Sequence, residues 1–192
     1  MTVTEATMRT IDAPGATLAY DVRPGGSNGQ PPLFLIGSPM GAAGFATLAS
    51  HFPDRTIITY DPRGAERSTK HDPASASIPA HHGDDLHRII HEVGGPVDLF
   101  ASSGGAVNAL ELVCRHPEDV RTLIAHEPPL ASVLPDGESA KAAVRAIQNS
   151  YQTRGFGAGM AHFIAVTSHQ GPFTAEIARR PAPNPAMYGL PT

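Results

Sequence analysis

The sequence has little of what secreted, disulfide-bonded or nucleic-acid-binding proteins need. Cys114 is its only cysteine, which excludes an intramolecular disulfide and a cysteine-rich metal site. The formal net charge is −4, and no run of lysine and arginine supplies the clustered positive charge that nucleic acid or an anionic membrane requires. These absences favour a reducing compartment, so the expected location is cytoplasmic.

Targeting and metal-binding signals are also missing. No stretch has the apolar length of a membrane span, and residues 1–15 lack the basic start and apolar centre of a secretory signal. The ten histidines include no His-Glu-x-x-His motif of the zinc proteases, and the adjacent His81 and His82 would point in different directions from a helix. The sequence therefore predicts no metal and no cofactor, and it favours surface positions for the histidines.

The apolar content is sufficient for one core, because 41% of the 192 residues are hydrophobic. Two extended runs, residues 8–13 and 18–22, flank a Pro-Gly turn and predict an N-terminal β-hairpin. The apolar run at residues 33–36 shows no alternation, which is typical of a strand buried on both faces.

Strand-like and helix-like segments then alternate. Strand-like runs at residues 56–60, 97–101 and 120–125 are separated by segments with apolar residues at helical spacing. These apolar residues are Phe45, Leu48 and Phe52, then Leu86, Ile89, Ile90 and Val93, then Val107, Leu110 and Cys114. The alternation predicts an α/β fold with a mostly parallel, doubly wound sheet, and such sheets bind ligands at the carboxyl ends of their strands.

The pattern changes after residue 130. Two apolar stripes at helical spacing follow each other without a strand between them, and residues 181–191 are too rich in proline for a helix or a central strand. The stripes are Val144, Ile147 and Tyr151, then Phe156, Met160, Phe163 and Ile164. We therefore expect a core over residues 1–130 and a helical lid with a proline-rich tail over residues 131–192.

The sharpest functional motif lies between a strand-like run and the next helix. Ser103 is the centre of a small-x-Ser-x-Gly turn, with Ala101 before it and Gly105 after it. Small residues let the strand and the helix cross closely, so the serine hydroxyl would stand above the sheet as a nucleophile. The Gly104 N–H would lie at a helix N-terminus, where it can stabilise an oxyanion. Ser102 lacks small neighbours in this register, and a phosphate-binding turn or helix cap is the alternative interpretation.

Together with this turn, residues 36–41, Ile-Gly-Ser-Pro-Met-Gly, resemble the loop after the third strand in the α/β-hydrolase superfamily. The resemblance implies that the Ser38 backbone N–H is the second oxyanion donor, beside the Gly104 N–H. It also implies that Pro39 can be cis. Ile36 differs from the family, which usually has histidine at this position.

Two further segments carry the resemblance. Residues 61–68, Asp-Pro-Arg-Gly-Ala-Glu-Arg-Ser, resemble the family's Asp-x-Arg-Gly-x-Gly-x-Ser segment. They are interpreted as structural, with Asp61 and Arg63 pairing or capping the loop near the site. Residues 120–129 resemble the sixth strand and the turn that follows it. The resemblance covers about residues 7–130 and extends only loosely to the lid.

The resemblance also implies a catalytic acid and a histidine later in the chain. The last two strands of the family have no candidate here, so the C-terminal part of the fold, with the usual histidine, is expected to be missing. Glu127 is a candidate acid or substrate contact; alternatively it caps the lid helix or pairs with Arg63. His126 is adjacent to Glu127, but neighbouring strand residues face opposite sides. His162 and His169 are lid residues that are candidates for a position over the pocket.

These observations predict a serine hydrolase that acts on a small ester, amide or lactone. A non-catalytic ligand-binding protein or an inactive truncated hydrolase is the alternative. A nucleotide-binding protein is a third class, but the chain lacks both Gly-x-Gly-x-x-Gly and Gly-x4-Gly-Lys. The expected partner is a small acyl substrate, with neither nucleic acid nor membrane. The strand at residues 120–125 would be an open edge, so a second copy or a complementing C-terminal segment is expected to cover it.

Overall fold

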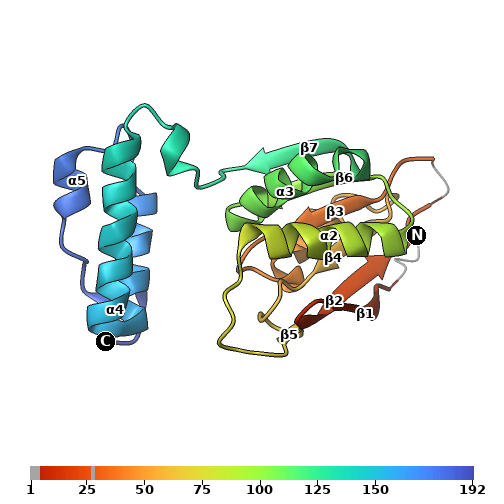
Figure 1. Ribbon diagram of the computed structural model, residues 1–192, viewed down its shortest axis with the longest axis horizontal. Helices are drawn as coiled ribbons and strands as arrows, with labels where there is room; N and C mark the ends of the chain where they lie inside the picture. Colours follow the sequence, from red (N-terminus) through yellow and green to blue (C-terminus); the bar gives the residue numbers. More distant parts are fainter. Residues whose placement is uncertain (1–4, 27–28) are drawn as a thin grey trace. The chain divides into compact units, whose positions relative to one another are not determined.

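The computed structural model describes residues 5–26 and 29–192. The first four residues of the N-terminal segment, in which no secretory signal was expected, lie outside the described residues. The chain divides into two compact units, one ending at Pro129 and the other spanning Leu130–Thr192. Figure 1 shows the first unit as a sheet with helices and the second as helices alone. Within the described residues, no helix has the length and apolar character needed to cross a membrane.

The strands of the first unit form one sheet in the order β1-β2-β4-β3-β6-β7, with β5 paired to β2. Their bounds are β1 (Thr7–Ala13), β2 (Ala16–Arg23), β3 (Leu33–Ile36), β4 (Ile57–Tyr60), β5 (Thr69–Lys70), β6 (Val97–Ser102) and β7 (Val120–His126). β3 lies parallel to β4 and β6, and β6 lies parallel to β7, whereas β1 and β2 form an antiparallel hairpin. The predicted hairpin and the mostly parallel α/β sheet are confirmed.

The helices of the first unit are η1 (Ala42–Phe45), α1 (Ala46–Ser50), α2 (Pro79–Val93), α3 (Gly104–Arg115) and η2 (Pro117–Asp119). Those of the second unit are η3 (Ala131–Val133), α4 (Gly137–Thr167), α5 (Ala175–Arg179) and η4 (Pro185–Tyr188). The short 3-10 helix η4 lies in the stretch where no helix was expected. It forms because the Asn184 side chain accepts a hydrogen bond from the Ala186 N–H, and because proline is compatible with a first helical turn.

Alternation along β3 distributes its side chains between two cores. Phe34 and Ile36 join the larger core, which includes residues of α2 and α3, while Leu33 and Leu35 pack with Phe45 of η1. Figure 1 shows α2 and α3 across the same face of the sheet. All four β3 side chains are buried, as predicted for a strand that is covered on both faces.

The buried face of α3 differs from the predicted stripe. Ala106, Ala109 and Leu112 are buried, whereas Cys114 is exposed. The predicted stripe was wrong, because it lies on a different side of the helix from the buried residues. Gly105 must face the backbone of the loop that follows β3, and this contact determines which side of α3 points inward. Alanines on that side allow the close approach.

The second unit also buries different residues from those predicted. α4 contains a break at Gly155, and hydrogen bonding between Ser150 and His162 joins its two halves. Small residues lie between the halves, so Tyr151 and Phe163, members of the predicted stripes, are exposed. An added Cβ at Gly159 would lie 2.8 Å from the Tyr151 Cβ, which shows how closely the halves pack. Helices at this separation bury alanine and glycine rather than large apolar side chains.

Candidate active site

Ser103 lies on the turn between β6 and α3 with backbone angles φ 56° and ψ −126°. A positive φ is rare for a residue other than glycine and costs about 1–3 kcal/mol. The Ser103 N–H donates a hydrogen bond of 2.9 Å to the His126 carbonyl oxygen, which ties the turn to the end of β7. Its side chain is exposed. This strained, exposed serine has the geometry predicted for a nucleophile elbow.

Two glycines after Ser103 allow the strand and helix to cross. An added Cβ at Gly105 would lie 2.8 Å from both the Cα and the carbonyl carbon of Gly37, and one at Gly104 would lie 2.8 Å from the Ser38 carbonyl oxygen. A real Cβ does not come this close to backbone atoms, so a side chain at either position would force the backbone to shift. The loop after β3 therefore packs directly against the start of α3, which brings Ser38 beside Gly104. The Ser38–Pro39 peptide bond is cis.

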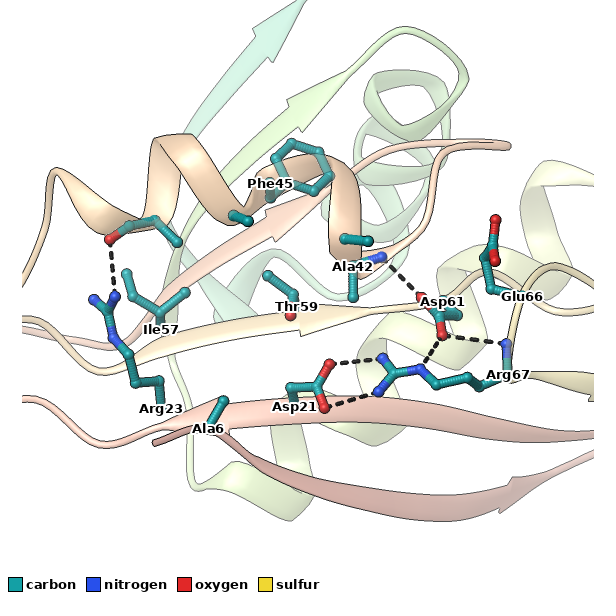
Figure 2. Close-up of a pocket in the computed structure, with 13 residues that line it drawn as sticks. Ala6, Asp21, Arg23, Ala42, Phe45, Ile57, Thr59, Asp61, Glu66 and Arg67 are labelled. Carbon is teal, nitrogen blue, oxygen red and sulfur yellow. Dashed lines mark hydrogen bonds and ion pairs between the residues drawn. The ribbon is translucent and has the colours of Figure 1, made fainter. Parts of the chain in front are cut away.

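Asp61, at the carboxyl end of β4, holds the loop after β3 in place. Its carboxylate accepts a 2.8 Å hydrogen bond from the Ala42 N–H of η1 and a 2.6 Å hydrogen bond from Arg67 Nε. Figure 2 shows Arg67 continuing this network to Asp21 of β2, with distances of 3.0 and 2.6 Å. Burial favours the neutral acid, but the hydrogen bonds from Arg67 and Ala42 outweigh it and keep the pKa of Asp61 below its usual value. Asp61 is therefore a structural anion, as predicted.

Arg63 does not pair with Asp61 or Glu127. Its guanidinium binds both carboxylate oxygens of Asp85 on α2, at 2.8 and 2.5 Å, and the Asp85 carboxylate is buried. The loop turns Arg63 towards α2 while Arg67 turns towards β2, so the predicted partner was wrong. The expected structural role of the segment is retained with a different pairing.

A cavity of about 500 Å³ lies beside the Asp61 network. Figure 2 shows that residues of β2, β4 and η1 line it, among them Asp21, Thr59 and Phe45. Ser103 is not a lining residue. Of the charged residues at the cavity, Asp21, Asp61 and Arg67 are paired with one another. The paired charges thus contribute to the structure of the cavity wall.

Ser102, His126 and Glu127 meet beside the elbow but do not form a catalytic triad. Ser102 Oγ lies 3.2 Å from His126 Nδ1, and Glu127 Oε2 lies 3.9 Å from the same nitrogen. A triad requires the serine and the acid on different ring nitrogens, because one nitrogen accepts the serine proton while the N–H of the other is held by the acid. The His126 and Glu127 side chains are 52% and 81% exposed. The three side chains thus lack the geometry of a catalytic triad.

The expectation that His126 and Glu127 face opposite sides was wrong. β7 ends at His126, and Glu127 has φ 50°, so the alternation of an extended strand stops before it. This left-handed residue turns the carboxylate back towards the imidazole. It also places Glu127 at the carboxyl edge of the sheet, the edge at which Ser103 lies.

None of the described histidines forms a hydrogen bond with the Ser103 hydroxyl. His162 is buried within the second unit, where its Nδ1 lies 2.8 Å from Ser150 Oγ, and His169 Nε2 lies 3.1 Å from the Pro172 carbonyl oxygen. Burial lowers the pKa of His162, with the Arg154 charge adding to the effect, so its neutral form is favoured. The two histidines are therefore engaged inside the second unit.

Comparison with known proteins identifies relatives with the same architecture. No family model matches the chain. It is 37% identical over 133 residues to the uncharacterized hydrolase YraK of Bacillus subtilis, which covers 67% of this chain and 47% of that protein. An α/β hydrolase from Sphaerobacter thermophilus is 24% identical with a TM-score of 0.62, over 91% of this chain and 66% of that one.

A second solved structure supports the same conclusion about the fold. The α/β hydrolase MGS-M2, from a Medee basin deep-sea metagenome library, is 12% identical with a TM-score of 0.62, over 81% of this chain and 55% of that one. The chain thus spans about half the length of the curated relative and up to two thirds of these structures. Sequence similarity to a hydrolase and structural similarity to α/β hydrolases agree, and the chain has the α/β-hydrolase fold.

Proposed function

We propose that this chain carries the nucleophile and the oxyanion donors of a serine hydrolase for small esters, amides or lactones. The observation that supports it most is the elbow: Ser103 has φ 56°, its side chain is exposed, and Gly104 packs against Ser38. In the proposed reaction Ser103 Oγ attacks the carbonyl carbon, the leaving group departs with a proton, and water then releases the acid from the acyl-enzyme.

The oxyanion donors would be the backbone N–H groups of Ser38 and Gly104. Gly104 is the first residue of α3, so its N–H is one of the groups that an α-helix leaves without an internal partner. The positive end of the helix dipole adds to the stabilisation of a developing negative charge. One such donor is worth about 3–4 kcal/mol in the transition state.

The reaction also needs a general base. A serine hydroxyl needs a general base to accept its proton, and removing the histidine of a triad lowers turnover by about a million-fold. Because no described histidine is hydrogen-bonded to the Ser103 hydroxyl, hydrolysis by this chain alone is expected to be slow. A ligand that binds without release of product would favour the ligand-binding alternative.

Glu127 is the proposed acid or substrate contact. It directly follows β7, and its carboxylate is exposed near the same edge of the sheet as Ser103. Glu127→Gln keeps the shape and deletes the charge, so it should lower turnover with little change in melting temperature. Unchanged turnover per folded molecule would remove Glu127 from the mechanism.

The proposal is tested with a small activated ester such as a nitrophenyl acetate. Hydrolysis by the wild type, Ser103→Ala and Ser102→Ala is measured with and without added imidazole, which can act as an external base. We expect imidazole-stimulated hydrolysis that is lost in Ser103→Ala and retained in Ser102→Ala. Equal rates in both variants, at equal melting temperatures, would exclude Ser103 as the nucleophile.

A further inference from the structure

A second cluster of chemically competent side chains lies at the amino ends of β6 and β7, away from the elbow. His87 and His91 occupy positions i and i+4 of α2, and Asp119 is the last residue of η2, directly before β7. His87 Nδ1 lies 2.7 Å from Asp119 Oδ2, and His91 Nε2 lies 3.5 Å from Asp119 Oδ1. One nitrogen or oxygen atom from each of the three residues lies within 4.8 Å of the others.

The carboxylate of this cluster is buried. The Asp119 side chain is 4% exposed, and among the described residues its carboxylate oxygens contact the two imidazoles. Among the described residues, no lysine or arginine forms an ion pair with the Asp119 carboxylate. A buried carboxylate needs a compensating positive charge, because the loss of hydration is costly. A cation held between the carboxylate and the two imidazoles would supply this charge.

The distances fit a transition metal with little rearrangement. Zinc binds histidine nitrogen at about 2.0–2.1 Å and carboxylate oxygen at about 2.0–2.2 Å, so ligand atoms on one ion lie within about 4.3 Å of each other. The observed separations approach this range. His116 stacks on His87 with ring centroids 3.8 Å apart, which restrains the orientation of the His87 ring. His91 is 65% exposed and is therefore free to adjust.

We propose that His87, His91 and Asp119 form a site for one divalent transition-metal ion, such as Zn²⁺, Co²⁺ or Ni²⁺. Two imidazoles and one carboxylate suit these ions, whereas Ca²⁺ and Mg²⁺ prefer oxygen ligands alone. The exposed side of His91 leaves the remaining coordination positions to water. The ion would clamp α2 to the turn that starts β7. The β7 strand has seven residues at about 3.3 Å each, so it separates this site from the elbow by about 23 Å. The ion would therefore stabilise the fold rather than take part in chemistry at the elbow.

The test is titration of the full chain, without an affinity tag, with ZnCl2 and separately with MgCl2 by isothermal calorimetry. We expect one equivalent of Zn²⁺ to bind, no comparable Mg²⁺ binding, and a melting temperature that rises with Zn²⁺. His91→Ala should weaken Zn²⁺ binding by at least about tenfold, because loss of a supporting group alone costs that much. The matched control is His51→Ala, which removes an exposed histidine at the end of α1.

Zn²⁺ binding should be weakened equally by His87→Ala, measured on samples whose circular dichroism matches the wild type. The metal-induced rise in melting temperature should disappear in both variants and persist in His51→Ala. Zn²⁺ affinity that is unchanged in His91→Ala, or lowered to the same extent by His51→Ala, would overturn the proposal. So would the failure of the wild type to bind Zn²⁺ at all.

Discussion

The two ends of β6 and β7 are built in different ways. At the carboxyl ends, backbone contacts define the site: Ser103 is strained, Gly105 touches Gly37, and the nearby His126 and Glu127 side chains are exposed. At the amino ends, side chains define it: the buried Asp119 carboxylate holds an imidazole at 2.7 Å. Both ends contain a histidine beside a carboxylate, but the Asp119 carboxylate is buried whereas the Glu127 carboxylate is exposed.

This difference predicts which substitutions matter at each end. A backbone-defined site is sensitive to an added Cβ and tolerant of changes to exposed polar groups. A side-chain-defined site is sensitive to loss of a polar partner, because the group left behind is buried.

The largest effect is expected for Gly105→Val. The new side chain would collide with the Gly37 backbone, which cannot rotate away, so the free energy of unfolding should fall by about 3 kcal/mol or more. The measurement is urea denaturation followed by circular dichroism. Gly94→Asn is the control at the amino ends, since nothing lies within 4 Å of an added Cβ there and asparagine tolerates its φ of 81°. An equal loss in both variants would contradict the close crossing at the elbow.

Asp119→Ala and Glu127→Ala compare the two carboxylates directly. Removing Asp119 deletes a buried hydrogen-bonding partner and should cost about 1–3 kcal/mol, whereas removing the exposed Glu127 should change stability by less than about 0.5 kcal/mol. Both variants are measured by the same denaturation without added metal. A larger loss for Glu127→Ala would reverse the assignment of the two ends.

His82, which also lies on α2, extends the comparison to a histidine that is not paired with a carboxylate among the described residues. It is buried with an unpartnered Nδ1, and burial, together with the charge of Arg63, lowers its pKa to about 4. Between pH 6.5 and pH 4 the unfolded chain therefore binds a proton that the folded chain excludes, so stability falls as the pH is lowered through this window. The His82 contribution to this loss should be about 1–2 kcal/mol at pH 5.

The matched variant is His82→Gln, in which the slope of stability against pH between 6.5 and 5 should be reduced. The same slope in His82→Gln and the wild type would show that His82 is accessible to protons in the folded state. Denaturation midpoints at four or five pH values in this window are sufficient for the comparison.

The smallest effect is expected at Ile124, on the same strand as His126. Ile124 is 57% exposed on an edge strand, and the chain is expected to self-associate through such apolar surface at micromolar concentration. Ile124→Lys should reduce the mass measured by light scattering, whereas Met187→Lys, at a 73% exposed position in the second unit, should not. A wild type that is monomeric at every concentration would contradict this expectation.

Much of the first unit could be predicted from its sequence because local signals agreed with each other. The apolar run at β3 indicates burial on both faces, and the small residues around Ser103 indicate a close crossing that only glycine allows. Such signals depend on backbone geometry and on neighbours along the chain. They specify the elbow without knowledge of distant residues.

The parts that could not be predicted depend on contacts between distant segments. The spacing of His87 and His91 is visible in the sequence, but the approach of Asp119 depends on the packing of α2 beside η2. The rotation of α3 and the inward face of α4 likewise depend on how closely neighbouring elements pack. Large apolar residues at helical spacing mark the wrong face when a glycine or alanine contact determines the interface.

The most direct test of the central claim is covalent labelling of the elbow serine. The wild type, Ser103→Ala and Ser102→Ala are treated with a fluorophosphonate, with and without added imidazole, and the labelled peptide is identified by mass spectrometry. The account predicts that the label is found on Ser103, is lost in Ser103→Ala and persists in Ser102→Ala. A label found on Ser102, or labelling that is unchanged in Ser103→Ala, would contradict it.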